Sequence, residues 1–185
     1  KSLILDTDLK FLKIFPASPS LAALEMELVN TFNRERRLSR VIELIKEDYD
    51  YIIIDAPPSL GLLTINVLTA AEKIIIPIQC EYYALQGLAE LLNSVRMVQK
   101  AINPKLEIAG ALLTMFDSRL SLSKQVSEEV NNCFSERVYQ TIIPRNVRLS
   151  EAPSVGKPII LYDILCIGSQ RYMKLAEEIL LLDKK

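Results

Sequence analysis

The sequence predicts an α/β fold, built as a doubly wound, mainly parallel sheet with helices on both faces. Two observations predict it. Short runs rich in isoleucine, leucine and valine alternate with segments of helical period along the chain, as in strand–helix–strand units. Half of the 185 residues are hydrophobic, so the chain can bury one substantial core, and residues 1–185 are expected to form a single domain. About five strands are expected, with their carboxyl ends at one edge because the crossovers are right-handed.

The first part of the chain is predicted to hold one strand and two helices. Residues 9–15 alternate apolar and polar side chains and stop at Pro16, as an edge strand does. Ser20 then offers an N-cap for a helix over 21–33, where apolar side chains recur at helical spacing. A second amphipathic helix is predicted over 37–47, and we expect it to pack against the sheet.

Residues 52–54 are predicted to form a central strand. Three consecutive isoleucines are typical of a parallel strand that is buried on both faces. The strand ends at Asp55, and the following Pro57 and Pro58 lack backbone donors and make the next segment a stiff loop. A mainly apolar helix is expected over 62–71.

The rest of the chain repeats the alternation. The longest helix is predicted over 84–102. It carries a stripe of leucines and valines, and Asn103 and Pro104 end it. Strands are predicted at 73–78, 108–115 and 138–142, and helices at 84–102, 122–134 and 168–182.

Composition limits the kinds of site that the chain can hold. The 22 basic and 23 acidic residues nearly balance, so any contact with nucleic acid must come from a local patch. The three cysteines are far apart and the chain has no histidine, so we expect buried thiols in a reducing cytoplasm and no zinc site. No stretch is apolar and long enough to span a bilayer.

Asp55 is the first candidate functional residue. In open α/β sheets, ligands bind at the carboxyl edge of the strands, where Asp55 is expected to lie. A carboxylate there can hold Mg²⁺ through water and so neutralise phosphate charge. The alternative interpretation is that Asp55 only caps the next turn or helix.

Residues 55–66 resemble the Walker B and switch II region of the ParA/Soj family of chromosome- and plasmid-partitioning ATPases. The resemblance extends from about residue 9 to residue 179 in consistent order, through segments 12–28, 77–88, 113–119 and 143–158. It implies a P-loop NTPase fold of the SIMIBI, or deviant Walker, type. It also implies that Asp55 is the Walker B acid acting on Mg²⁺ through water, and that Pro57 and Pro58 belong to switch II.

The resemblance also assigns roles to later loops. Two loops would border the adenine of ATP or ADP, although Pro144 can also be interpreted as a residue that only ends a strand. The adenine-side residues are Thr114, Met115, Phe116, Pro144, Arg145 and Asn146.

Four basic residues are candidates for a DNA-facing patch, because such groups contact phosphates without reading sequence: Arg119, Lys124, Arg145 and Arg148. The alternative is that each is simply solvated. Glu81, Tyr82 and Tyr83 lie in a segment that the family places toward its dimer interface, although two adjacent tyrosines at such a turn can also be half-buried core.

The chain departs from the family in one respect. No G-x-x-x-x-G-K-[ST] motif occurs, and the five glycines are too scattered to form one. Without the phosphate loop and its lysine, transition-state charge is not stabilised, so this chain alone is not expected to hydrolyse ATP. We therefore expect the C-terminal portion of a longer protein that lacks its first strand and its P-loop, although a natural truncation is the alternative.

The resemblance implies a bacterial cytoplasmic, nucleoid-associated protein. In the intact protein, ATP and Mg²⁺ would join two subunits, the homodimer would bind double-stranded DNA non-specifically, and a ParB/Spo0J-type protein would stimulate hydrolysis. A different reading is a non-enzymatic module that binds DNA or a partner without nucleotide. A third is a MinD-like, membrane-cycling relative, but residues 178–185 are too short for a convincing interfacial helix, so no stable membrane association is expected.

Overall fold

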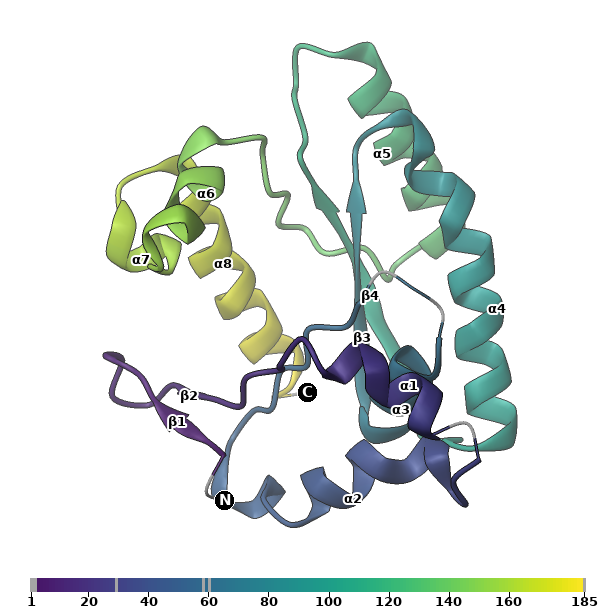
Figure 1. Ribbon diagram of the computed structural model, residues 1–185. Helices are drawn as coiled ribbons and strands as arrows, with labels where there is room; N and C mark the ends of the chain where they lie inside the picture. Colours follow the sequence, from purple (N-terminus) through teal and green to yellow (C-terminus); the bar gives the residue numbers. More distant parts are fainter. Residues whose placement is uncertain (1–2, 29, 58, 60, 185) are drawn as a thin grey trace. The chain divides into compact units, whose positions relative to one another are not determined.

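A computed structural model describes residues 3–28, 30–57, 59 and 61–184 (Figure 1). The chain groups into two compact units. The N-terminal unit contains Lys1–Glu72 and Ser94–Leu106, and the C-terminal unit contains Lys73–Asn93 and Glu107–Lys185. Helix α4 (Gln86–Ala101) contributes residues to both units. The expected single domain over residues 1–185 stays a prediction.

The N-terminal unit begins with a small antiparallel hairpin rather than with the predicted strand at 9–15. Strand β1 (Leu5–Asp6) pairs with β2 (Lys13–Ile14), and both are exposed. Residues between them form the turn, in which the Thr7 hydroxyl donates to the carbonyl of Leu12 at 2.9 Å. The prediction was right for 13–14 and wrong for 9–12, because the side chains of 9–12 belong to a turn, and β2 itself is an exposed edge.

Helices of the N-terminal unit form where predicted but are shorter. The helix predicted over 21–33 ends early, and Asn33 has a left-handed backbone with φ 54°, which an α-helix cannot continue through. The elements are α1 (Leu21–Leu28), the 3₁₀ turn η1 (Arg34–Arg36), α2 (Arg37–Glu43), the 3₁₀ turn η2 (Lys46–Asp48) and α3 (Leu62–Ala70).

Two asparagines, one of them buried, link segments of this unit. Asn66 of α3 is 5% exposed; its amide nitrogen donates to the carbonyls of Arg34 and Leu62, and its oxygen accepts the N–H of Leu38. Asn103 donates to carbonyls at the end of α3, including that of Ala71 at 2.8 Å. These contacts satisfy helix-end groups that would otherwise lack partners.

The predicted central strand at 52–54 is absent from the described ladders. These residues adopt no regular secondary structure, and Ile53 is 92% exposed. A run of isoleucines favours a strand only if a neighbouring strand supplies hydrogen bonds and covers both faces. Among the described residues no ladder forms at 52–54, so the prediction of a buried strand was wrong here.

The C-terminal unit contains the parallel sheet. Strand β3 (Lys73–Gln79) pairs in parallel with β4 (Glu107–Thr114), as predicted for 73–78 and 108–115. Residues 138–144 run beside β4 but pair only at two isolated parallel bridges, Ala111 with Val138 and Phe116 with Pro144. Besides the β1–β2 hairpin, the described part of the chain therefore has one parallel pair extended by a bridged segment, in place of the single sheet of about five strands predicted.

The helices of this unit include two short ones that periodicity did not predict, α6 and α7. Both are too brief to show a helical repeat in sequence. The elements are η3 (Tyr82–Leu85), α4, α5 (Ser121–Phe134), α6 (Val147–Glu151), η4 (Ala152–Val155), α7 (Ile159–Tyr162) and α8 (Ile167–Leu182).

Helices cover both faces of the β3–β4 pair, which confirms the doubly wound α/β fold (Figure 1). On one face, Ile76, Ile78 and Leu113 form a core with residues of α4 and α5. On the other, Leu112 and residues of the bridged segment pack against Leu175 of α8. Neighbouring strand positions point to opposite faces, so β4 contributes Leu113 to the first core and Leu112 to the second. No helix in the described ranges is long and apolar enough to cross a bilayer.

The three cysteines differ in exposure. Cys80 is buried, and burial raises the pKa of its thiol to about 11, so it stays protonated. Cys133 is exposed and Cys166 is half-buried, so the expectation of three buried thiols was wrong for these two.

Candidate functional site

The loops at the carboxyl ends of β4 and the bridged segment are joined by backbone hydrogen bonds. The Phe116 N–H donates to the carbonyl of Ile143 at 3.2 Å, and the Arg145 N–H donates to the carbonyl of Phe116 at 3.0 Å. The Cys80 N–H, just after β3, donates to the carbonyl of Thr114 at 2.9 Å. Residues 114–116 and 144–146, which the family resemblance places together on the adenine side, therefore meet at one edge of the C-terminal unit.

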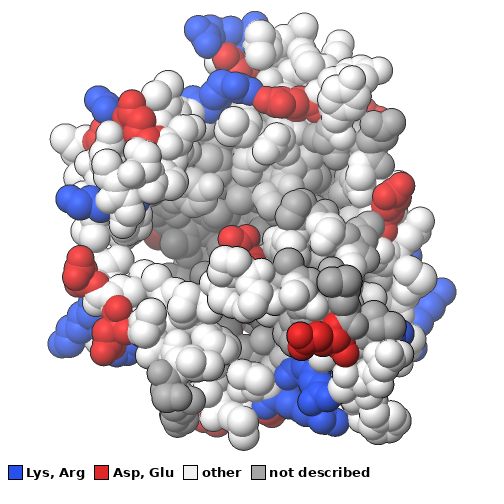
Figure 2. Space-filling model, in the orientation of Figure 1, with Lys and Arg blue, Asp and Glu red and all other residues white. Residues whose placement is uncertain are grey.

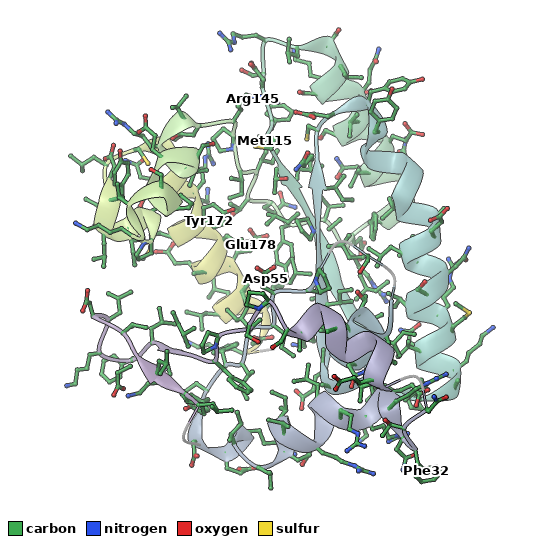
Figure 3. The ribbon with its side chains drawn as sticks, in the orientation of Figure 1. Phe32, Asp55, Met115, Arg145, Tyr172 and Glu178 are labelled. Atoms are coloured by element: carbon green, nitrogen blue, oxygen red, sulfur yellow. The ribbon has the colours of Figure 1, made fainter. Side chains whose placement is uncertain are left out.

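The turn after β4 has an unusual backbone. Met115, labelled in Figure 3, has φ 54°, a left-handed conformation that few residues other than glycine adopt. The loop is fixed by Ser123, which is 1% exposed: its hydroxyl donates to the carbonyl of Cys80 at 3.3 Å and accepts the Asp117 N–H at 3.4 Å. Backbones in rare conformations occur often at ligand sites.

Arg119 forms an ion pair with Asp117 in the same loop. Its Nε and one terminal nitrogen donate to the two carboxylate oxygens at 2.9 and 2.7 Å. The Asp117 carboxylate also accepts the Arg119 backbone N–H at 3.0 Å. These bonds from the Arg119 side chain and backbone lower the pKa of Asp117 to about 2, and the nearby Arg145 adds a smaller electrostatic effect.

Arg145 forms an ion pair with Glu81, which follows β3. Tyr82 and Tyr83, the next residues, are 73% and 75% exposed and stack edge to face, with ring centroids 5.2 Å apart. An open pocket of about 340 Å³ lies at this end of β3, lined by Pro77, Ile78, Gln79, Glu81 and Tyr83. Both tyrosines are thus exposed rings and not half-buried core, and Tyr83 lines the pocket.

Arg148 lies in α6, whose start is capped by the Asn146 side chain, which accepts the Arg148 N–H at 2.9 Å. The Arg148 guanidinium donates to Glu151 at 2.9 Å and lies 3.5 Å from Asp163. The Tyr162 hydroxyl donates to the same Glu151 carboxylate at 3.0 Å. The bonds from Arg148 and Tyr162 hold the pKa of Glu151 below its usual value.

Lys124 lies on the exposed face of α5. Within the part of the chain that the structure describes, it has no ion pair, whereas Arg119, Arg145 and Arg148 each have one. Over the upper part of Figure 2, blue basic side chains lie directly beside red acidic ones.

Asp55 belongs to the N-terminal unit, where it lies exposed in a segment without regular structure (Figure 3). Pro57 is half-buried, and Pro58 lies outside the described residues. No group of three potential metal-binding side chains occurs among the described residues. A lone exposed carboxylate still fits Mg²⁺, because this ion keeps several waters and binds to one or two carboxylates together with substrate phosphates.

The ion pairs that engage the arginines are the features of the site that the sequence interpretation missed. Asp117 stands two residues before Arg119, and Glu151 stands three residues after Arg148. The second spacing is that of a helical ion pair and could have been read from sequence. The pairing of Glu81 with Arg145 spans 64 residues and could not.

Comparison with known proteins gives a consistent family. A family model described as an AAA domain matches residues 1–108. The sporulation initiation inhibitor protein Soj of Bacillus subtilis is 59% identical over 173 residues, which cover 94% of this chain and 68% of that protein. The chromosome partitioning protein ParA of Myxococcus xanthus is 52% identical over 180 residues, 97% of this chain and 64% of that protein. The chain thus spans about two thirds of the length of these relatives.

Solved structures share the fold. Cobyrinic acid a,c-diamide synthase from Mycobacterium smegmatis superposes with a TM-score of 0.81 at 34% identity, over 97% of this chain and 66% of that one. The same enzyme has been crystallised with ADP and magnesium, and that structure superposes with a TM-score of 0.73 at 38% identity, over 79% of this chain and 59% of that one. The cell division ATPase MinD from Pyrococcus furiosus, at 22% identity and a TM-score of 0.73 over 97% of this chain and 70% of that one, shares the fold alone.

Proposed function

Because the chain belongs to the ParA/Soj family of chromosome-partitioning ATPases, we propose that it serves in an ATP-dependent DNA-partitioning protein. In that protein, ATP and Mg²⁺ join two subunits, the homodimer binds double-stranded DNA without sequence preference, and a ParB-type partner stimulates hydrolysis. The protein would be cytoplasmic and associated with the nucleoid.

The observation that carries this proposal is the backbone bonding of Phe116 to Ile143 and Arg145. It joins the two segments that resemble the family's adenine-side loops, over residues 114–116 and 144–146. Backbone groups in such loops can read the polar edge of a base, and ligand sites in this fold class lie at the carboxyl edge of the sheet. Side-chain contacts also fix each loop: Ser123 holds the first, and the Glu81–Arg145 ion pair holds the second. The loops are therefore ordered before a ligand binds.

Asp55 is proposed as the acid that acts on Mg²⁺ through water. Its side chain is exposed, and a single carboxylate suits an ion whose other ligands are water and phosphate. Magnesium bound beside the phosphates would neutralise part of their charge. Pro57 and Pro58 are proposed as the switch segment that follows it.

The DNA-facing surface is proposed to consist of Arg119, Lys124, Arg145 and Arg148. Arg119 is 86% exposed, and the side chains of Arg145 and Arg148 are about half exposed, so all three guanidinium groups can reach a phosphate. Doubling a weak patch by dimerisation makes DNA binding depend on nucleotide, because two weak sites on one dimer act together. Glu81, Tyr82 and Tyr83 are proposed as part of the dimer interface, since exposed tyrosines are enriched in such surfaces.

The test is DNA binding by the full-length protein, expressed from its complete reading frame, followed by fluorescence anisotropy with a labelled duplex of arbitrary sequence. Binding is expected with ATP and Mg²⁺ and is expected to be lost when Arg119 and Arg148 are both changed to Glu. A control pair, Lys105→Glu with Lys174→Glu, reverses the same number of exposed charges elsewhere and should retain binding.

Three outcomes would contradict the proposal. Unchanged binding by the Arg119→Glu, Arg148→Glu variant would exclude the assigned surface. Equal binding with and without ATP would favour the nucleotide-independent module, and robust co-sedimentation with lipid vesicles would favour a MinD-like cycle.

A further inference from the structure

Three of the four proposed DNA-contacting side chains are already engaged by carboxylates of the same unit. Arg119 is bound by Asp117, Arg145 by Glu81, and Arg148 by Glu151 with Asp163 nearby. A guanidinium that donates to a carboxylate in a side-by-side geometry presents the same donors that it would present to a phosphate. Carboxylate and phosphate therefore compete for one set of nitrogens.

We infer that Asp117 and Glu151 regulate the DNA-facing surface by holding Arg119 and Arg148 in internal ion pairs that DNA phosphates must displace. The inference rests on the proposed function, because it concerns the same surface. Each acid lowers the affinity for DNA by the free energy of its ion pair, and each arginine becomes available only when phosphate replaces the carboxylate.

The hydrogen bonds show that each exchange leaves no acid without a donor. When the Arg119 guanidinium leaves, Asp117 keeps the backbone N–H of Arg119 at 3.0 Å. When Arg148 leaves, Glu151 keeps the Tyr162 hydroxyl at 3.0 Å. An acid that retains a partner does not incur the cost of an unpaired charge, so the arginine can be released without disturbing the fold.

In the Asp117–Arg119 pair the acid is nearly buried and the arginine is exposed, as the replacement of carboxylate by phosphate requires. The Asp117 side chain is 13% exposed, whereas that of Arg119 is 86% exposed. The acid is therefore fixed in the loop while the guanidinium lies in solvent, where a phosphate can approach it. Exposed ion pairs are weak, so the competition is expected to change affinity by roughly two- to fivefold per pair and not to abolish it.

The test uses Asp117→Asn and Glu151→Gln in the full-length, ATP-bound protein. Each variant keeps the shape of the side chain and most of its hydrogen bonds but removes the charge that competes with phosphate. We expect each to bind duplex DNA roughly two- to fivefold more tightly than the unaltered protein. The control Glu129→Gln, on the exposed surface of α5, makes the same change in net charge at a residue that forms no ion pair with any arginine the structure describes.

A double-mutant cycle isolates the contact from overall charge. In the Arg119→Ala background, Asp117→Asn should give no gain beyond that of Glu129→Gln, because there is no guanidinium to release. Unchanged or weaker DNA binding by Asp117→Asn, or a gain equal to that of Glu129→Gln, would overturn the inference while leaving the proposed function intact. Failure of the unaltered protein to bind DNA with ATP would instead overturn the proposed function.

Discussion

The Glu178 carboxylate of α8 accepts the backbone N–H of Thr141 at 2.9 Å, and its other oxygen accepts the N–H of Gln140 at 2.6 Å. Residues 138–144 run along β4, and Glu178 supplies acceptors to the same segment from α8 (Figure 3). A helix side chain thereby satisfies N–H groups that a neighbouring strand would satisfy in a wider sheet. The segment leads directly into the proposed adenine-side loop at 144–146.

Replacing Glu178 with Ala is expected to lower the free energy of unfolding by about 1–3 kcal/mol, because the buried N–H of Thr141 loses its acceptor. Glu178→Gln keeps one acceptor oxygen and should lose less. Urea unfolding followed by circular dichroism measures both, with Glu177→Ala, an exposed neighbour, as the control. Equal stability of Glu178→Ala and Glu177→Ala would show that water replaces the carboxylate.

Gly168 allows α8 to approach α6 closely. A Cβ at this position would lie 2.6 Å from Cγ of Leu149. We expect Gly168→Ala to destabilise the protein by about 1–3 kcal/mol, because the leucine must leave its packed position. Gly87→Ala in α4 is the matched control, since a Cβ there meets nothing within 4 Å and alanine favours a helix by up to about 1 kcal/mol. A thermal midpoint of Gly168→Ala at or above that of the unaltered protein would exclude this packing constraint.

The parallel core was predictable from sequence because its signals are local. The isoleucines of β3 and the apolar run of β4 specify strands, and the stripe of α5 specifies a helix that covers them. The strand at 52–54 shows the limit of this reasoning, because three isoleucines indicate burial but do not supply the neighbour that a ladder requires. Without a ladder, Ile53 is left 92% exposed.

The candidate site, like the fold, was predictable only in part. Residues 114–116 and 144–146 were predicted from family segments, and the structure brings their backbones together. The ion pairs that hold the arginines were not predicted, because a pairing such as Glu81 with Arg145 depends on which strand ends meet and not on sequence spacing. Asn66 was missed for a similar reason: inside an apolar helix it read as part of a motif, whereas it bonds to three separate backbone groups.

Asn66→Ala is expected to destabilise the N-terminal unit by about 2–4 kcal/mol. The change removes the side-chain amide of a residue that is 5% exposed. The N–H of Leu38 then loses its acceptor, and the carbonyl of Arg34 loses its donor. The control Asn132→Ala deletes an amide of the same kind from the exposed surface of α5. It should change the free energy of unfolding by less than about 0.5 kcal/mol. Chemical unfolding of the two variants side by side makes the comparison, and similar midpoints would mean that the Asn66 bonds contribute little.

The pKa of Asp117, about 2 against a usual 3.8, predicts how the Asp117–Arg119 pair responds to acid. Because the folded state lowers this pKa, the pair adds stability that is fully present above pH 3.8 and is lost as the pH falls through about 2. NMR titration of the side-chain carboxyl should therefore give a midpoint near 2 in the unaltered protein. Arg119→Ala should raise that midpoint toward 3.8, and Arg145→Ala should raise it less, because Arg119 supplies the hydrogen bonds and Arg145 only a smaller electrostatic effect. A midpoint that stays low in Arg119→Ala would show that Arg119 does not hold the acid in its charged form, and would remove the ion pair on which the exchange with phosphate depends.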